Sequence, residues 1–354
     1  MNFAKNHGGP IHYLGNRYLS LPNLSGQMTP DLTWLTDLFR IIENNSHGKR
    51  YKRAFEPFAG SASWSLAAME AGLADEYHIN DSDSILIHTH QLMKDHPEQV
   101  KSTYLALSEE YNSASSKYEF LVELINTYNA AVSSEKSLLL PFVVNHVWAG
   151  ILFHDTKNNI LINTTEKSEK KYTDFLIKPN LSPKEFTEEV DRVSTLFNTH
   201  KVIFTSGDFM ESISELNQDD FVALNPPYPE NTRSLTDKTG MYTELYSPTL
   251  LHEKLVVLID RLDQANIDYF MTYGFYNPDM RQFVLRDQNQ NPRNYFRPLG
   301  YEDCLCGNVL DQMYFKAKWT MPENLHSPIR LASEVLHGAE LTQSEALTCF
   351  NQSK

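Results

Sequence analysis

The sequence predicts an α/β protein with a central mixed sheet and a mainly helical insertion. Three patterns support this prediction. Short apolar runs such as 221–224 lie between polar residues, which is typical of buried parallel strands. A turn of small residues at 59–63 joins a strand to a helix. Helical periodicity from about Ser84 to Ser133 then separates the second strand from the later ones, which makes this stretch part of an insertion.

The expected elements follow a simple order along the chain. They are a helix through 32–39, a strand from 53, a helix through 66–68, a strand at 76–81, the helical stretch, a β-hairpin with its returning strand at 160–162, a helix from 182, strands at 201–204 and 221–224, a helix at 250–262, strands at 267–272, 294–297 and 312–315, and a final helix at 331–336. The helix at Ser182 is the best marked, because Pro183 and Glu185 follow it as a capping signature requires.

The composition is ordinary for a globular protein. The chain has 354 residues, enough for one large α/β domain with an insertion or for two domains. No segment approaches the roughly 20 apolar residues of a membrane span, so we expect a cytoplasmic protein without membrane contact. Three cysteines form no disulfide framework, and no cysteine or histidine cluster predicts a metal site.

The charge limits how the chain can contact nucleic acid. The formal net charge is -14, which argues against a protein that coats nucleic acid, because phosphate binding requires clustered Lys and Arg. Any DNA contact must therefore be local. Each candidate basic patch has the alternative of a solvated face; the patches are Lys49-Arg50 with Lys52-Arg53, then Lys167, Lys170 and Lys171, then Arg281, Arg286, Arg293 and Arg297.

The tetrapeptide Asn225-Pro226-Pro227-Tyr228 directly follows the apolar strand at 221–224. In open α/β sheets, ligands bind at the carboxyl ends of the strands. The two prolines supply no backbone donors, so their carbonyls and the Asn225 side chain form a stiff set of acceptors that suits an amino group. Tyr228 can stack on the ring that carries the amine. The alternative is a proline turn with a tyrosine packed on it.

Two further segments favour a nucleoside ligand. Asp81 ends a strand about 20 residues after the turn at Gly60, and this is the spacing at which a nucleoside-binding βαβ unit places its ribose-binding acid. The loop around Gly15 precedes a helix and can present backbone donors to a ligand.

With its motifs in this order, the chain resembles the DNA adenine methylase (Dam) family, the alpha group of S-adenosylmethionine-dependent amino methyltransferases. The resemblance covers roughly residues 9–317. It rests on Tyr13-Leu14-Gly15-Asn16-Arg17, Phe55-Glu56-Pro57-Phe58-Ala59-Gly60-Ser61, Asn80-Asp81, Asp208-Phe209 and Asn225-Pro226-Pro227-Tyr228. It implies that Asn225, Pro226, Pro227 and Tyr228 are catalytic, and that the cofactor-binding residues are Tyr13, Gly15, Arg17, Glu56, Phe58, Gly60, Asp81, Asp208 and Phe209.

The resemblance also implies a fold, an activity and an arrangement of domains. The fold would be the Rossmann-like class I methyltransferase fold, with residues 1–83 and 200–318 forming the catalytic domain, 84–199 a target recognition insertion and 319–354 a helical tail. The implied reaction moves a methyl group from S-adenosylmethionine to N6 of a flipped adenine in DNA, without a metal, in the setting of restriction-modification.

The chain departs from the family pattern at several positions. The family more often has Asp where Asn225 stands, Gly where Ala62 stands and Lys where Arg17 stands, and the stretch after His146 lacks its arginine and its Pro-Phe-Gly turn. The target sequence is therefore not implied. RNA remains open as a substrate. The alternatives are a degenerate methylase that acts as a binding protein and a protein glutamine methyltransferase, whose side-chain amide presents a similar amino group.

Overall fold

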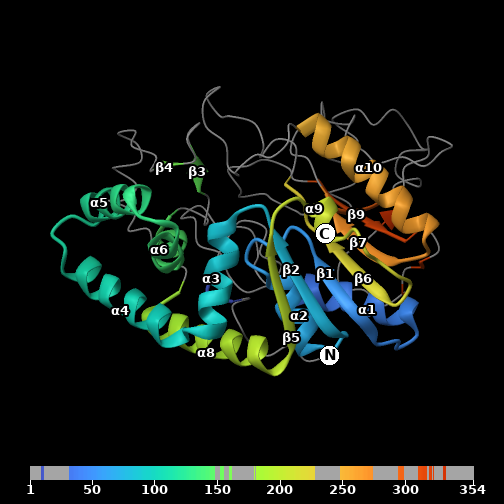
Figure 1. Cartoon of the computed structure of the whole chain (residues 1–354), viewed down its shortest axis with the longest axis horizontal. Coiled ribbons are helices and arrows are strands. Elements are labelled where there is room, and N and C mark those ends of the chain that lie inside the picture. Colours follow the sequence, from blue (N-terminus) through green and yellow to red (C-terminus); the bar gives the residue numbers. More distant parts are fainter. Residues whose placement is uncertain are drawn as a thin grey trace.

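The computed structural model describes residues 9–11, 32–147, 152–154, 159–161, 179, 181–227, 248–273, 294–298, 310–316, 319–320, 322 and 330–331. These residues form an α/β fold with a twisted sheet at its centre (Figure 1). Among the described residues the main sheet has the strand order β10-β8-β9-β7-β6-β1-β2-β5. A separate pair, β3 with β4, stands apart from it.

The central part of the sheet is parallel, and one edge is antiparallel. The parallel strands are β1 (Tyr51–Glu56), β2 (Ala74–Asp81), β5 (Lys201–Ser206), β6 (Asp220–Leu224) and β7 (Asp268–Thr272). The antiparallel strands are β8 (Asn294–Pro298), β9 (Leu310–Phe315) and β10 (Arg330–Leu331). The predicted mixed sheet is confirmed, and it has the architecture of a Rossmann-like α/β fold.

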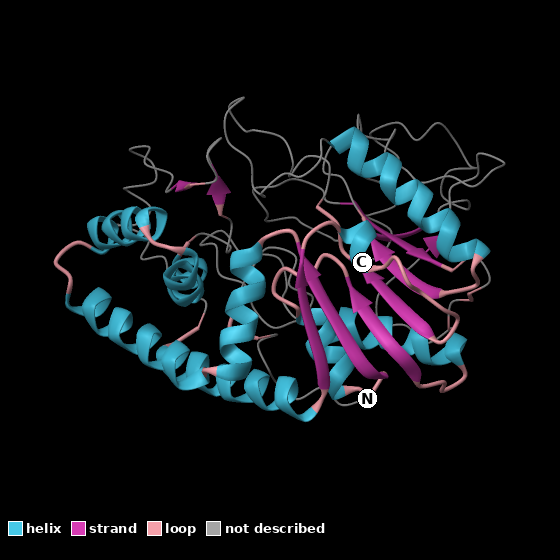
Figure 2. Ribbon diagram, in the orientation of Figure 1, coloured by secondary structure: helices cyan, strands magenta, loops and turns pink. Residues whose placement is uncertain are grey.

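Helices cover the two faces of the sheet (Figure 2). On one face, α1 (Leu32–Ser46) and α2 (Ser63–Glu70) pack on a core that includes Phe221, Ala223 and Phe270. On the other face, α9 (Phe209–Ser212) and α10 (Pro248–Gln264) pack on Val222, Leu224 and other residues. Successive side chains of β6 thus enter opposite cores, and this explains why the whole run 220–224 is buried and apolar after its first residue.

The predicted insertion lies between β2 and β5. It contains α3 (Ser84–Asp95), α4 (Pro97–Ser113), α5 (Lys117–Ala130), α6 (Ser133–His146), the hairpin β3 (Phe153–His154) and β4 (Ile160–Leu161), and α8 (Pro183–Thr199). Figure 1 shows α4, α5 and α6 extending beyond the β5 edge, whereas α3 lies against β2 and β5. The capping box predicted at Ser182 is present, since Glu185 N is 3.3 Å from the Ser182 hydroxyl and Ser182 N is 2.8 Å from the Glu185 carboxylate.

One predicted element is wrong at its start. A helix was expected from Leu331, but Leu331 belongs to β10 and pairs with Tyr295 of β8. Pairing with a strand far away in the sequence overrides the local helical pattern here, because an edge position in a sheet supplies hydrogen bonds that the sequence pattern does not reveal. The rest of that expected helix lies outside the described residues.

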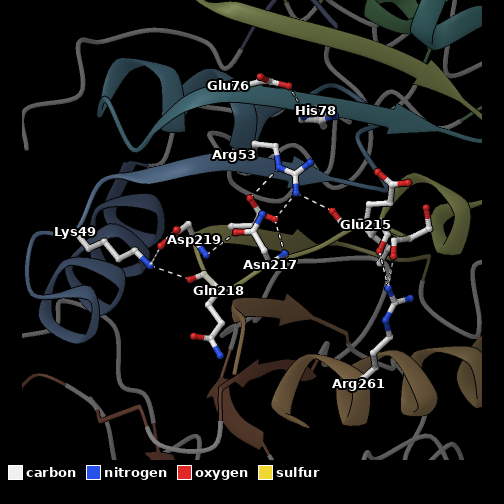
Figure 3. Close-up of polar contacts among 12 residues, drawn as sticks. Lys49, Arg53, Glu76, His78, Glu215, Asn217, Gln218, Asp219 and Arg261 are labelled. Carbon is white, nitrogen blue, oxygen red and sulfur yellow. Dashed lines mark hydrogen bonds and ion pairs between the residues drawn. The ribbon is translucent and has the colours of Figure 1, made fainter. Parts of the chain in front are cut away.

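An ionic network holds the amino-terminal edge of the sheet (Figure 3). Arg53 of β1 makes two bonds to the Asp220 carboxylate, Nε to Oδ1 at 2.9 Å and a terminal nitrogen to Oδ2 at 2.6 Å. Asp220 is completely buried. Lys49 lies 3.1 Å from Asp219, and Arg50 lies 2.8 Å from Asp75. These cations of the candidate DNA patch therefore pair with carboxylates, at the end of the sheet opposite the predicted site.

Candidate functional site

The strand order places the predicted site at a topological switch point. From β1 the chain passes to β2 and β5 on one side of the sheet, and later to β6 and β7 on the other side. The carboxyl ends of β1 and β6 are therefore adjacent, with Phe55 opposite Val222 in the parallel register. Crevices at such points are where open α/β sheets bind ligands. Glu56 ends β1, and Asn225 directly follows β6.

The loop between β1 and α2 is held through the peptide groups of Gly60. Its N–H donates to Asp81 Oδ2 at 2.8 Å, and its carbonyl oxygen lies 2.8 Å from His90 Nε2. His90 lies on α3 and is 2% exposed; burial lowers its pKa to about 4. The imidazole is thus neutral at pH 7, and its Nε2 donates the bond. Gly60 has φ of 50°, a left-handed conformation that glycine adopts without steric cost.

Ala62 in the same loop is also left-handed, with φ of 55°, and it is completely buried. The glycine common in the family is favoured at such a position because a Cβ adds about 1 kcal/mol of strain there. The Ala62 side chain packs in the core beside the amino-terminal end of α2. In the described structure, this departure from the family pattern is accommodated by the fold.

Glu56 is buried at the end of β1. Its carboxylate accepts a hydrogen bond of 3.0 Å from the Ser65 backbone N–H in the first turn of α2. Burial raises the pKa of Glu56 to about 7, and the nearby Asp81 carboxylate adds to the shift, while the bonds from Ser65 lower it. Because the pKa of Glu56 is close to 7, its charge changes with pH in the neutral range and would also respond to a cation beside it.

Asp81 connects the ends of three neighbouring segments. Besides Gly60, its carboxylate accepts the Asp83 N–H at 2.9 Å, and its backbone carbonyl accepts the Gly207 N–H at 3.1 Å. Burial raises the pKa of Asp81 to about 6, against the lowering effect of the backbone bonds. A carboxylate oxygen can accept two hydrogen bonds. The two oxygens of Asp81 together therefore retain capacity for a further donor such as a hydroxyl group.

The Asp208-Phe209 pair lies beside the Glu56-to-Gly60 loop. The rings of Phe58 and Phe209 are 4.7 Å apart and in direct contact, so no third ring lies between them. Asp208 caps α9, accepting the Met210 N–H at 2.7 Å, and Lys254 of α10 lies 3.7 Å from its carboxylate. Phe58, Asp208 and Lys254 are partly exposed, whereas Phe209 is buried. The three partly exposed side chains are the groups of this cluster that a ligand can reach.

Asn225, Pro226 and Pro227 extend beyond β6. Pro226 is buried, while Asn225 and Pro227 are half-buried. The Asn225 Oδ1 atom accepts a hydrogen bond of 3.0 Å from the hydroxyl of Thr272, the last residue of β7. Thr272 is completely buried. The Asn225 carboxamide thus lies at the carboxyl-terminal end of the parallel strands and is hydrogen-bonded to the neighbouring strand β7.

The described amino-terminal residues 9–11 are held in place by hydrogen bonds to helices α6 and α8. Gly9 N–H donates to Glu189 on α8 at 3.0 Å, and Asn145 on α6 donates to the Pro10 carbonyl at 2.9 Å. Ile11 is completely buried. Gly9 has φ of +99°, and a Cβ there would meet Leu66 at 3.0 Å. The predicted site residues Tyr13, Gly15, Arg17 and Tyr228 lie outside the described residues.

Sequence reasoning missed several residues that organise the site. Asn80 donates to the carbonyls of Pro57 and Gly207, both at 3.1 Å, and thereby joins the loops after β1 and β5. His90 and Thr272 were also missed. Asn80 is part of the Asn80-Asp81 motif that carries the resemblance, but the sequence assigned no role to it. The other two carry no local signal, because each contacts a residue distant in the sequence.

The described part of the chain offers neither a membrane-spanning helix nor a metal site. No helix there is both long and apolar enough to cross a membrane. No group of three or more His, Cys, Asp or Glu side chains there is arranged to hold a metal ion.

The fold and the site are those of a Rossmann-like α/β protein with its polar groups gathered at the switch point. The chain belongs to the family of D12 class N6 adenine-specific DNA methyltransferases, whose model matches residues 34–270. It is similar to the Type II methyltransferase M1.LlaDCHI of Lactococcus lactis subsp. cremoris, with 24% identity over 186 residues. That match covers 51% of this chain and 58% of the relative, so the chain spans less than two thirds of the relative's length.

Proposed function

We propose that this protein transfers a methyl group from S-adenosylmethionine to the exocyclic N6 amino group of adenine in DNA. Membership of the D12 class carries the proposal. The arrangement of acceptors after β6 supports it, because Asn225 Oδ1 and the Pro226 carbonyl belong to one segment that follows β6, and β6 is the neighbour of β1 in the sheet. The similarity to a type II methyltransferase favours a role in restriction-modification.

The residues after β1 and β2 fit the cofactor. Asp81 has acceptor capacity left for a ribose hydroxyl, and Glu56 and Asp81, when ionised, place negative charge near a cationic ligand. Phe58 offers a partly exposed ring for an adenine base to stack on from one side. From the sequence, we infer that Tyr13, Gly15 and Arg17 also bind the cofactor. S-adenosylmethionine, when bound, supplies a methyl group on a positively charged sulfur.

The catalytic residues would make the amine a better nucleophile. The lone pair of the adenine N6 atom is delocalised into the ring, so it attacks poorly. Asn225 Oδ1 and the Pro226 carbonyl accept hydrogen bonds from the two N–H groups of the amine. These bonds favour a tetrahedral nitrogen with its lone pair directed toward the methyl carbon. The nitrogen–carbon bond forms as the sulfur–carbon bond breaks, sulfur keeps the bonding pair, and the nitrogen releases one proton to solvent.

The target adenine must leave the DNA helix to reach this turn. Extrusion costs a few kcal/mol, which stacking and hydrogen bonds in the pocket offset. We assign the stacking to Tyr228, which follows the second proline.

We also propose a division of the chain into domains. Residues 84–199 would form the target recognition insertion, 1–83 with 200–318 the catalytic domain, and 319–354 a tail, although Leu331 within that tail lies in a strand.

Methyl transfer into unmethylated duplex DNA tests the proposal. The protein is incubated with S-adenosylmethionine labelled on the methyl group and with mixed-sequence DNA that lacks N6-methyladenine, and digested nucleosides are then separated. Label in N6-methyl-2′-deoxyadenosine is expected. Asn225→Ala should lower the rate about 10²- to 10³-fold, since an acceptor of the transition state is removed. Tyr228→Ala should also lower it, and both variants should still bind the cofactor in calorimetry.

The outcomes separate the competing functions. Label that appears in glutamine of a translation-factor substrate and in no nucleic acid would favour a protein methyltransferase. Cofactor or DNA binding without transfer to any substrate would favour a binding protein. Rates unchanged in both variants would refute the roles assigned to Asn225 and Tyr228.

A further inference from the structure

We propose that Thr272 is a positioning residue that orients the carboxamide of Asn225 for the amine of the substrate. This inference rests on the proposed function, because it assigns to Asn225 Oδ1 the acceptor role in methyl transfer. Its observation is the 3.0 Å hydrogen bond that the Thr272 hydroxyl donates to Asn225 Oδ1.

The sheet register brings the two residues together. Leu224 pairs with Met271 in the parallel ladder of β6 and β7, so the next positions along the two strands are Asn225 and Thr272. Paired residues of parallel strands point to the same face. Phe221 and Ala223 of β6 and Phe270 of β7 pack in the same core, on one face of the sheet. Asn225 and Thr272 lie two residues further along these strands, and alternation along a strand places them on that same face.

The two ends of a carboxamide are not equivalent, and this is why orientation matters. The oxygen accepts two hydrogen bonds, whereas the nitrogen only donates. A rotation of 180° about the last side-chain bond would direct N–H groups at the amino group of the substrate, and donor would then face donor. The Thr272 hydroxyl donates to Oδ1, so this bond favours the orientation in which the oxygen, and not the nitrogen, is the group presented as acceptor.

The burial of Thr272 makes this support stiff. Thr272 is completely buried, while Asn225 is half-buried at the edge of the sheet. A β-branched side chain in a strand has few rotamers, and its hydroxyl therefore stays where the backbone of β7 places it. An exposed carboxamide would otherwise exchange its partner for water. Thr272 would act on the reaction through its hydrogen bond to Asn225.

An aspartate at the first position of the tetrapeptide gives a direct contrast. A carboxylate presents an acceptor at either end, so a half-turn changes nothing. The need for an orienting hydroxyl should therefore be strong in the wild type and weaker in the variant Asn225→Asp. This difference distinguishes orientation from a merely structural role, which would be the same in both proteins.

The test measures single-turnover methyl transfer into mixed-sequence DNA free of N6-methyladenine, with saturating labelled S-adenosylmethionine. Thr272→Val removes the hydroxyl at nearly constant volume and should lower the rate about five- to ten-fold, the equivalent of one hydrogen bond. Thr272→Ser keeps the hydroxyl and should stay within about two-fold of the wild type on the same scale. Calorimetric affinity for S-adenosylmethionine should change less than about two-fold in either variant.

Thr272→Val is also combined with Asn225→Asp, and its effect is expressed relative to Asn225→Asp alone. We expect a loss below about two-fold in that background. Rates in Thr272→Val equal to those in Thr272→Ser, or equal losses in both backgrounds, would overturn the inference. If Asn225→Asp transfers no methyl, the comparison of valine with serine decides alone, and Thr272→Ala replaces the valine variant if that variant does not fold. A wild type without transfer would overturn the proposed function itself.

Discussion

Replacing Glu56 with glutamine should change how stability depends on pH. Glu56 is 3% exposed, and burial raises its pKa from 4.5 to about 7. Between these values the folded protein binds a proton that the unfolded chain does not bind. The stability contributed by protonated Glu56 is fully present below about pH 4.5 and is lost as the pH rises through 7. Glutamine has nearly the same shape and no charge, so Glu56→Gln removes this loss.

The magnitude follows from the size of the shift. The pKa changes by about 2.5 units, from 4.5 to about 7, and each unit corresponds to about 1.36 kcal/mol. Most of this range lies between pH 5 and pH 8. The wild type should therefore lose about 2 to 3 kcal/mol of unfolding free energy from this group over that interval, and Glu56→Gln should not.

The assay is urea unfolding of both proteins without cofactor, followed by tryptophan fluorescence at pH 5, 6, 7 and 8. The quantity of interest is the unfolding free energy of Glu56→Gln minus that of the wild type. Constant effects of the substitution, such as a weaker acceptor for the Ser65 N–H, cancel when this difference is compared across pH. The titration of His90, which opposes that of Glu56, is present in both proteins and also cancels.

The difference should rise by about 2 to 3 kcal/mol between pH 5 and pH 8. A difference that stays constant within about 0.5 kcal/mol would refute the reasoning, because it would mean that Glu56 titrates alike in the folded and unfolded chains. A difference that falls with pH would refute it as well, since that is the behaviour of a carboxylate stabilised in its charged form.

Two further pairs of substitutions test contacts at opposite ends of the sheet. Arg53→Met leaves the completely buried Asp220 without its cation and should lower the urea-derived unfolding free energy by about 3 kcal/mol, whereas Lys49→Met removes an exposed pair and should cost below about 1 kcal/mol; similar losses in both would contradict this account. His90→Phe leaves the Gly60 carbonyl without its donor and should cost about 1 to 3 kcal/mol. Calorimetry should show weaker binding of S-adenosylmethionine by His90→Phe and recovery in His90→Gln, and unchanged affinity in both would argue that the bond does not position the loop.

Parts of the fold that depend on short-range patterns could be predicted from the sequence. The buried strand β6 is marked by the run 221–224, and the start of α8 is marked by the capping pattern at Ser182. The return of the β3–β4 hairpin was found in the same way. Each of these signals lies within a few residues, because helix and strand periodicity and turn chemistry are local properties of the chain.

The candidate site could be predicted only in part. Asp81 and Asn225 were found because a strand end followed by a polar residue is visible in the sequence. The two-residue strand β10 was assigned wrongly, since its partner β8 lies far away along the chain. Whether Tyr228 stacks on the base stays a prediction, and its position lies outside the described residues.

By itself, the sequence determined the class of fold and the family resemblance, and it predicted which residues accept hydrogen bonds from an amine. Only the tertiary structure decided which groups hold those residues in place. Thr272 is 47 positions from Asn225, and His90 is 30 positions from Gly60. Neither pair follows a periodicity of the chain, because each is created by the order of strands and the path of the insertion. Local patterns specify elements, whereas contacts between elements depend on how the whole chain packs.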